Sequence, residues 1–546
     1  MLAGKGAPSV MLPTAIRLGL SLARRLRGDR RGAVAIQFAI LAVPLAVLSF
    51  GLVDINRASV AKRELQDALD AATLMAARSS ATNNSGLQTV GSQALVAQLG
   101  SMSDATLVSS NFALGGTGSS TVVATATAKV TPIIANLWLK GDMTVGASSQ
   151  VVRSQNKLEV VMVLDNTGSM GSNLGSSTKI TALKTAATGL VSTLQAAASR
   201  SSLTDPIKIG VVPFSMSVNV GSTYQNASWI TGTQPSEYGE DLFGTPTNRF
   251  AMLTQMGASW AGCVESRPAP YDVQDTAPTN SNKATMFVPY FAPDEPDDNT
   301  ISYTSGRRTR YYSWDNNYIS NDGTSSSDWK TRQNRWTKYS TSISSSAKGT
   351  GNYGPNRECG LTSLLRLTTS FSTVTSKLNS MVAVGNTNVA MGLMWGWHLL
   401  SPNTPFADGV AYGTPKVTKV VILLTDGDNT NDETSDPENS IYTGVGYMWQ
   451  KRLLKAGSTS TYLDETSSAT DRRDAIDDRE KILCTNMKAK GIVIYSIGVG
   501  VSTHSKSILQ ACATYSDYYY DVTDASQLDT VFDNIAGAIA SLRISK

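Results

Sequence analysis

Three oxygen-bearing side chains alternate directly after an apolar run in the first half of the chain. Residues 160–164 are all apolar, and Asp165, Thr167 and Ser169 follow at every second position. An apolar run without polar alternation is typical of a strand that is buried on both faces of a parallel sheet. Ligands of such sheets collect at the carboxyl ends of the strands, so we expect these side chains at a ligand-binding edge.

Two further loops should reach the same edge. Thr387 lies in the segment 384–396, just before a predicted helix, and Asp426 with Gly427 ends another apolar run at 420–425. Oxygen ligands from Asp, Ser and Thr suit a hard divalent cation, with Mg²⁺ preferred and Mn²⁺ or Ca²⁺ as alternatives. The predicted ligands are Asp165, Thr167, Ser169, Thr387 and Asp426.

The composition of this ligand set predicts what the site does. Two carboxylates and three neutral hydroxyls give a divalent cation no surplus of negative charge and leave room for another ligand. Such a site favours an oxygen donor from outside, such as an Asp or Glu carboxylate of a protein partner. The two histidines, His398 and His504, are expected to lie elsewhere.

Sequence signals for catalysis do not accompany the site. The chain has no G-x-S-x-G, no phosphate-binding G-x-x-x-x-G-K-[ST] and two histidines in all. Its net charge of +4 comes largely from an N-terminal arginine cluster and does not indicate nucleic-acid binding. We therefore expect a binding protein that is not an enzyme and has no nucleic-acid partner.

Short apolar runs rich in Val and Ile alternate with helical patterns and would position these loops. Such alternation predicts an α/β fold with a doubly wound, mostly parallel sheet. The predicted strands are residues 158–165, 207–215, 416–427 and 491–500, and the predicted helices are residues 179–198, 389–400, 471–490, 503–513 and 525–542.

Two segments, residues 221–378 and 429–469, interrupt this rhythm. The larger holds five of the nine tryptophans. A structureless loop of such length is uncommon inside a domain, so we expect an inserted subdomain at 221–378 and a smaller insertion at 429–469.

The N-terminal region predicts a membrane anchor. Five arginines between residues 24 and 31 precede residues 32–53, which carry no charge. About 20 apolar residues cross the hydrocarbon core as a helix, and a positive flank stays in the cytoplasm. The bulk of the chain is therefore expected across the membrane, anchored by one transmembrane helix.

The helical pattern continues beyond the span, and a different pattern follows it. Spacings of three and four predict a stalk helix with an apolar stripe of Ala58, Ala61, Leu65, Leu69, Ala72 and Met75. From about residue 83 to 153, small or β-branched residues alternate with polar ones, which predicts a small β-rich module. The expected division is 1–31 cytoplasmic, 32–53 transmembrane, 54–80 stalk, 81–155 β-rich module and 156–546 α/β domain.

Four cysteines lie beyond the span. An even number in an oxidising compartment predicts two disulfides, and three connectivities are possible. Pairing by region is preferred, which joins Cys263 to Cys359 and Cys484 to Cys512.

Two acidic segments, residues 293–298 and 431–439, could hold a second Ca²⁺. Neither matches the spacing of an EF-hand loop, so solvated loops are the favoured interpretation.

The ligand pattern resembles a known one. Asp165-x-Thr167-x-Ser169, Thr387 and Asp426-Gly427 resemble the metal-ion-dependent adhesion site (MIDAS) of von Willebrand factor A domains. The usual middle residue is serine, and Thr167 keeps the hydroxyl. The resemblance implies a von Willebrand A-like fold and divalent-cation-dependent protein binding.

The membrane segment also has a resemblance. Residues 30–77, with the closing residues 512–546, resemble TadG-type proteins, which join a TadE/TadG-like segment to a periplasmic von Willebrand A domain. This implies a single-pass bacterial inner-membrane protein that assists assembly or anchoring of a Flp/Tad-type pilus, with pilus-assembly components as partners. Related minor pilins have Glu where this chain has Gln37, so we expect the segment to be retained. The alternatives are a pilin-like subunit processed near Gly32, and a metal-dependent adhesion module unrelated to pili.

Overall fold

The computed structural model describes most of the chain in two compact units. The described residues are 33–79, 81, 83–100, 105–115, 121–133, 141–152, 156–199, 201, 203–243, 247–297, 302–305, 308–311, 314–320 and 328–542. The units divide between Arg153 and Ser154, and each is described by itself. The predicted cytoplasmic segment 1–31, with its arginine cluster, lies outside the described residues.

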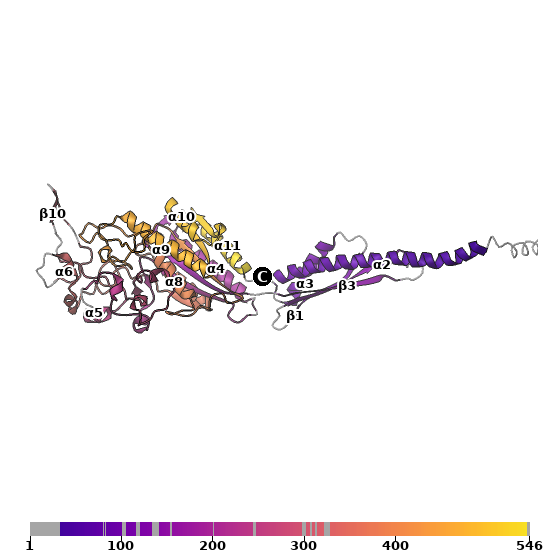
Figure 1. The fold of residues 1–546 in the computed structure, drawn as a ribbon, viewed down its shortest axis with the longest axis horizontal. Coiled ribbons are helices and arrows are strands. Elements are labelled where there is room, and N and C mark those ends of the chain that lie inside the picture. Colours follow the sequence, from indigo (N-terminus) through magenta and orange to yellow (C-terminus); the bar gives the residue numbers. More distant parts are fainter. Residues whose placement is uncertain are drawn as a thin grey trace, which may run out of the picture. The chain divides into compact units, whose positions relative to one another are not determined.

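The N-terminal unit packs helices on a three-stranded sheet. Its antiparallel strands have the order β1-β2-β3, and α2 packs against β2 and β3. Figure 1 shows the strands running alongside α2. The elements are α2 (Ala33–Arg78), α3 (Asn84–Leu99), β1 (Ala105–Gly115), β2 (Thr121–Val130) and β3 (Met143–Val152).

Helix α2 combines the predicted span and the predicted stalk without a break. Among the described residues, its part Ile36–Arg78 is the one helix that is long and apolar enough to cross a membrane. Large apolar side chains near its start are exposed, whereas Leu65 and Leu69 are fully buried against the sheet. The predicted stripe is correct up to Ala72 but then continues through Ala76, while Met75 is 52% exposed.

Residues 84–99 form a helix, although strands were predicted from about residue 83. Asn83 caps α3 by accepting a hydrogen bond from the Gly86 amide. The helix buries Leu87, Gly91 and Leu95, a spacing of four that the sequence contains but that its many small residues conceal.

A six-stranded sheet forms the centre of the second unit. Its order is β12-β7-β4-β13-β14-β15, and every neighbouring pair is parallel except β12 with β7. This confirms the predicted fold class, a doubly wound and mostly parallel α/β sheet. The strands are β4 (Lys157–Asp165), β7 (Ile207–Phe214), β12 (Leu365–Thr368), β13 (Val417–Thr425), β14 (Val493–Val499) and β15 (Tyr519–Val522).

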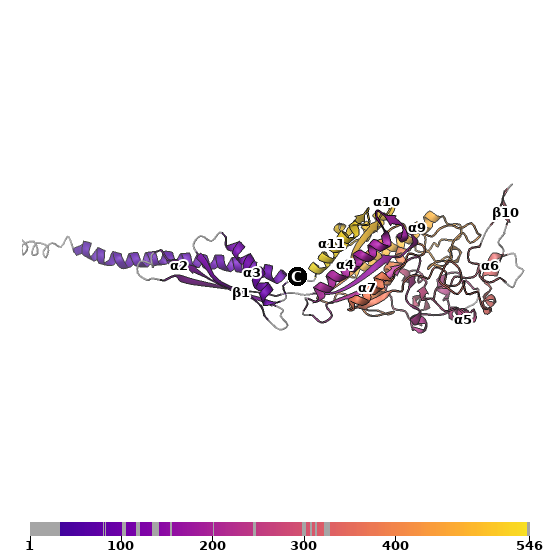
Figure 2. The same cartoon turned by 180° about the vertical axis from the view of Figure 1, so that it is seen from behind.

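Helices cover both faces of this sheet, because alternate strand residues point to opposite sides. Val160 and Met162 of β4 pack with the helices of one face, and Val161 and Val163 with those of the other. Figures 1 and 2 show the two faces from opposite sides. The first face carries α4 (Lys179–Ser199), α7 (Phe371–Asn379) and α11 (Gln527–Leu542); the second carries α8 (Val389–Leu400), α9 (Ala469–Ala489) and α10 (Thr503–Cys512).

The larger predicted insertion is shorter than expected, and its described residues form no core apart from that of the sheet. β12 and nearly all of α7 fall in residues 221–378 but belong to the sheet and its first face. Apolar residues of both insertions join the core on the second face, among them Trp229, Phe287 and Tyr442. The short elements outside the main sheet are β5 (Asn173–Leu174), β6 (Ser177–Thr178), β8 (Val218–Asn219), α5 (Arg249–Gln255), β9 (Cys263–Val264), β10 (Ser302–Ser305), β11 (Arg308–Tyr311) and α6 (Trp329–Gln333).

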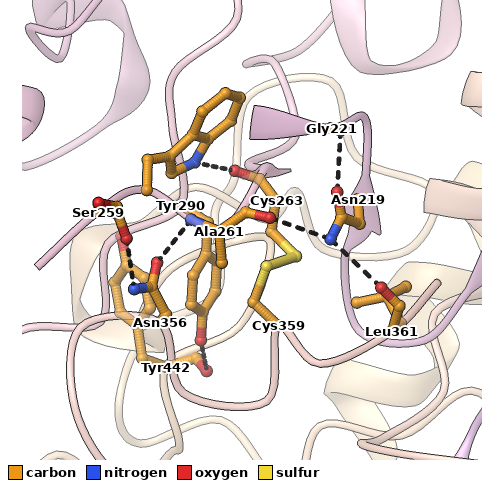
Figure 3. Close-up of a disulfide and its surroundings, with 11 residues drawn as sticks. Asn219, Gly221, Ser259, Ala261, Cys263, Tyr290, Asn356, Cys359, Leu361 and Tyr442 are labelled. Atoms are coloured by element: carbon orange, nitrogen blue, oxygen red, sulfur yellow. Dashed lines mark hydrogen bonds between the residues drawn. A yellow bond between two sulfur atoms is a disulfide. The ribbon is translucent and has the colours of Figure 1, made fainter. Parts of the chain in front are cut away.

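Both disulfides have the preferred pairing, Cys263–Cys359 and Cys484–Cys512. The first lies inside the larger insertion (Figure 3). There Asn219 donates hydrogen bonds to the carbonyls of Ala261 (3.1 Å) and Leu361 (3.2 Å), one on each side of the bridge. The disulfide and this amide thus hold two distant segments of the insertion together.

The acidic segments 293–298 and 431–439 contain buried acids, although solvated loops were the favoured interpretation. Asp294, Glu295 and Glu438 are each at most 3% exposed. The sequence could not show this, because the partners of Asp294 and Glu295, such as Tyr339 and Tyr447, lie far from them in the chain.

Candidate metal centre

The predicted ligands meet where the strand order of the sheet reverses, because β7 follows on one side of β4 and β14 on the other side of β13. Leu164 of β4 pairs with Leu424 of β13, so Asp165 and Asp426 lie at neighbouring strand ends. Helix α4 follows β4 on one face, and α9 follows β13 on the other. Such a switch point leaves a crevice outside the strand ends, where ligands bind in open α/β sheets.

Asp165 is the most buried of the predicted ligands, with no exposed surface. Its Oδ1 accepts a hydrogen bond from the Thr167 amide (2.8 Å) and its Oδ2 from the Thr425 hydroxyl (2.7 Å). Burial, and then the charge of Asp426, raise the pKa of Asp165 to about 6. The folded chain therefore places two carboxylates together at a cost that a bound cation would offset.

Hydrogen bonds connect the predicted ligands of the two loops. The Ser169 hydroxyl donates to Oδ1 of Asp426 at 2.6 Å, and the hydroxyl oxygens of Thr167 and Ser169 are 2.9 Å apart. Ser169 lies in a 3₁₀ turn, Gly168–Gly171, which turns the chain back toward β13. Four of the five predicted ligands thus lie in one hydrogen-bonded group.

Thr387 lies in the loop that borders this group. The Gly168 amide donates to the Gly385 carbonyl at 2.9 Å, which joins the loop to the Thr167–Ser169 turn. The Thr387 amide donates to the Thr430 hydroxyl at 3.1 Å, in the loop after β13. In the described part of the chain, the Thr387 hydroxyl makes no hydrogen bond to the other four predicted ligands.

Lys179 is a residue of the site that the sequence reasoning missed. Its ammonium donates to Oδ2 of Asp426 at 2.9 Å, and the Lys179 side chain is 12% exposed. The lysine is the first residue of α4, ten positions after Ser169, and its position in the sequence alone does not indicate this contact. It places one positive charge where a cation would bind.

A second group of polar side chains lies beside the loop that follows β13. Nε2 of His504 is 2.6 Å from Oδ2 of Asp477, and possible ligand atoms of these two residues and Asp474 lie within 4.8 Å of one another. Ser505 donates to Asp428, which follows the predicted ligand of β13 by two residues. His504 therefore lies beside the loop that follows β13 and, in the described part of the chain, makes no hydrogen bond to the five predicted ligands. The sequence places Asp474 and Asp477 three residues apart, which puts them on one face of a helix. It does not show that α10 packs on α9 and brings His504 to them.

The residues at the strand ends fit a hard divalent cation. They offer carboxylate and hydroxyl oxygens from three loops, and burial together with the Asp426 carboxylate raises the pKa of Asp165, a penalty that a cation would relieve. When bound, the ion would supply a Lewis-acidic centre for an outside carboxylate. Asp165 and Asp426 would supply charge, and Thr167, Ser169 and Thr387 would supply neutral oxygens.

A comparison with protein families identifies the domain that contains the N-terminal helix. Residues 32–79 match the family model described as "Putative Flp pilus-assembly TadE/G-like". The chain therefore carries a TadE/G-like domain at residues 32–79, followed in the sequence by the α/β domain described above. A comparison with curated proteins found no match.

Several solved structures from pili are similar to this chain at low identity. The pilus adhesin SpaC from Lactobacillus rhamnosus GG is 13% identical (TM-score 0.33), and the match covers 81% of this chain and 35% of SpaC. The vWF domain of the type V pili tip protein Mfa5 from Porphyromonas gingivalis is 10% identical (TM-score 0.32; 72% and 97% covered). The PilB minor pilin from Streptococcus sanguinis is 12% identical (TM-score 0.31; 80% and 79% covered). This chain spans about a third of the length of SpaC. Its fold class is assigned from the order of the strands in its own sheet.

Proposed function

We propose that this chain is a membrane-anchored protein that binds a partner through a divalent cation during assembly or anchoring of a Flp/Tad-type pilus. The observation that carries the proposal is the hydrogen-bonded group of Asp165, Thr167, Ser169 and Asp426 at the sheet edge. The Tad domain at residues 32–79 supports the role in pilus assembly.

The ion in this proposal is Mg²⁺, with Mn²⁺ or Ca²⁺ as substitutes. Hydroxyl ligands carry no charge, so Asp165 and Asp426 alone balance the ion and leave no negative charge to repel a further carboxylate. An Asp or Glu of a pilus-assembly component would complete the coordination. The chain acts in this scheme as a binding protein and not as an enzyme.

The proposed location is the bacterial inner membrane. Helix α2 would cross it once, with residues 1–31 in the cytoplasm and the bulk in the periplasm. Two disulfides support an oxidising compartment. A reporter fused to the C-terminus should be active outside the cytoplasm, and the intact N-terminal mass should exclude cleavage near Gly32.

Crosslinking in cells tests the binding role. A photo-crosslinker at Ser172, an exposed residue just after the Thr167–Ser169 turn, should capture a protein in the parent and lose it in Asp426→Ala. The same crosslinker with Asp529→Ala, which changes an exposed acid on α11, should retain the product. Equal capture in all three strains would contradict cation-dependent binding.

A further inference from the structure

Helices α9 and α10 bring an imidazole and two carboxylates together beside the loop that follows β13. The two helices pack on each other (Figure 1). Nε2 of His504, the second residue of α10, lies 2.6 Å from Oδ2 of Asp477 in α9. Asp474 precedes Asp477 by about one helical turn, and one ligand atom from each of the three residues lies within 4.8 Å of the other two. A nitrogen and two oxygens from two helices thus face a common point.

The two helices are joined covalently close to this group. The disulfide Cys484–Cys512 connects α9 to α10. Cys484 follows Asp477 in α9, and Cys512 follows His504 in α10, by about two helical turns in each case. The bridge therefore fixes the helices in the register that places His504 against Asp477, so the group exists before anything binds to it.

A buried acid beside this group has an oxygen without a partner. The side-chain amide of Asn429 donates to Oδ1 of Asp477 and to Oε2 of Glu480, both at 2.8 Å, so these two carboxylates are neighbours. Glu480 is 2% exposed, and its Oε1 accepts no hydrogen bond from any described residue. Both acids line one cavity of about 10 Å³, roughly the space of a single water. The interior side of the group thus has an unused oxygen and room for a water.

Few basic groups balance the acids here. Arg473 donates to Oδ1 of Asp474 at 2.8 Å, but this pair is exposed on the helix surface and contributes little. Asp477 is 3% exposed, and His504 is its one ion-pair partner among the residues that the structure describes. A buried carboxylate whose single counter-charge is an imidazole is well placed to bind a metal ion instead.

We propose that Asp474, Asp477 and His504 form a Zn²⁺ site that fastens α9 to α10. An imidazole ligand favours Zn²⁺ over Mg²⁺ and Ca²⁺, which prefer oxygen ligands alone. Zn²⁺ binds nitrogen and oxygen at about 2.0–2.2 Å, so two of its ligand atoms are at most about 4.4 Å apart. The observed group needs only small side-chain movements to reach these distances. Three protein ligands leave one position for water or for a ligand from outside.

This site shares no ligand with the sheet-edge centre but contacts the loop that carries Asp426. Asp428 accepts hydrogen bonds from the hydroxyls of Ser502 (2.5 Å) and Ser505, on either side of His504. Asn429 is the residue that donates to Asp477. An ion that holds α10 against α9 would therefore also hold residues 428 and 429 in place, directly after Asp426.

Zinc binding to the full chain in detergent tests the proposal. The parent is Asp165→Ala in excess Mg²⁺, so that the sheet-edge centre cannot bind Zn²⁺ and the result does not depend on the proposed function. Competition with a chromophoric chelator should show one Zn²⁺ bound per chain. Loss of an outer-shell partner costs about 10–100-fold in metal affinity, so His504→Ala, which removes a direct ligand, should weaken binding by more than about 100-fold.

The variants are chosen to separate ligation from general damage. His504 is partly exposed, so His504→Ala is expected to fold, and circular dichroism checks this. Asp477→Asn should also weaken binding more than about 100-fold, because it removes a direct ligand. Asp529→Asn makes the same change at an exposed position on α11 and should bind Zn²⁺ as the parent does.

Cobalt absorption gives a readout that a merely structural role would not change. Co²⁺ in the parent site should give visible bands that Zn²⁺ abolishes. Folded His504→Ala should lack these bands, and Asp529→Asn should keep them. A parent that binds no Zn²⁺, or equal Zn²⁺ affinity in the parent and folded His504→Ala, would overturn the proposal and leave His504 and Asp477 as an ion pair between two helices.

Discussion

Lys179 provides a sharp prediction about the sheet-edge centre. Its ammonium is 2.9 Å from Asp426 Oδ2, and the Asp426 side chain is fully buried. A cation that takes this oxygen must displace the ammonium or bind close to it. Lys179→Met keeps the length of the side chain and removes the competing charge, so the variant should bind Mg²⁺ more tightly than the parent.

The magnitude follows from the contact that is lost. A hydrogen bond between charged groups contributes about 1.5–3 kcal/mol, and each 1.4 kcal/mol is a tenfold change in a dissociation constant. The Mg²⁺ dissociation constant of Lys179→Met should therefore fall by roughly 10- to 150-fold. Isothermal titration of the full chain in detergent measures it.

A matched control and a second measurement sharpen the test. Lys184→Met makes the same change on the same helix and should leave the affinity unchanged. Without Mg²⁺, Lys179→Met should melt below the parent because Asp426 loses its ion-pair partner, and Mg²⁺ should restore the loss. An unchanged or weaker Mg²⁺ affinity in Lys179→Met would refute the competition between lysine and metal.

Three further predictions concern stability. Removing Cys263–Cys359, which spans 96 residues, should cost about 4–5 kcal/mol in denaturant unfolding, and a loss below 1 kcal/mol would contradict the entropic account. Burial raises the pKa of Glu480 from 4.5 to about 8, so the parent should lose roughly 3–5 kcal/mol of stability as the pH rises through this window. In urea unfolding, Glu480→Gln should remove this dependence of the unfolding free energy on pH. If the unfolding free energies of the parent and of Glu480→Gln changed equally with pH, Glu480 would not be the titrating group. A Cβ at Gly392 would lie 2.5 Å from the buried ring of Phe214, so Gly392→Ala should destabilise the protein by about 1–3 kcal/mol. Gly189 faces open space, so Gly189→Ala should stabilise it by about 0.5–1 kcal/mol. Equal changes in the unfolding free energy would contradict the close contact between Gly392 and Phe214.

The central strands of the sheet could be predicted because each of them is marked by a continuous run of apolar residues in the sequence. The middle of a parallel strand that is buried on both faces is apolar, as residues 160–164 of β4 and 420–424 of β13 are. The carboxyl ends of neighbouring parallel strands share one edge of a sheet, so the two apolar runs predict that Asp165 and Asp426 lie close together. Strand β12 was not predicted, because an antiparallel edge strand of four residues with an exposed Arg366 lacks the long apolar pattern of a buried strand.

What could not be predicted depends on contacts between distant segments. Lys179 reaches Asp426 across 247 positions, and the sequence gives no reason for that pair. Burial, and then the charge of Glu295, raise the pKa of Glu438, and only the packing of the two insertions brings Glu295 close to it. The acidic character of these segments favoured solvated loops, since most carboxylates are exposed.

Magnesium binding by the intact centre is the most direct test of the central claim. The full chain in detergent should bind Mg²⁺ at the sheet edge, and Asp165→Ala should lose that binding, because it removes the one ligand that is wholly buried and terminates β4. Circular dichroism confirms that the variant is folded. If folded Asp165→Ala binds Mg²⁺ as tightly as the parent, the ion is not held at the ends of β4 and β13, and the proposed site is wrong.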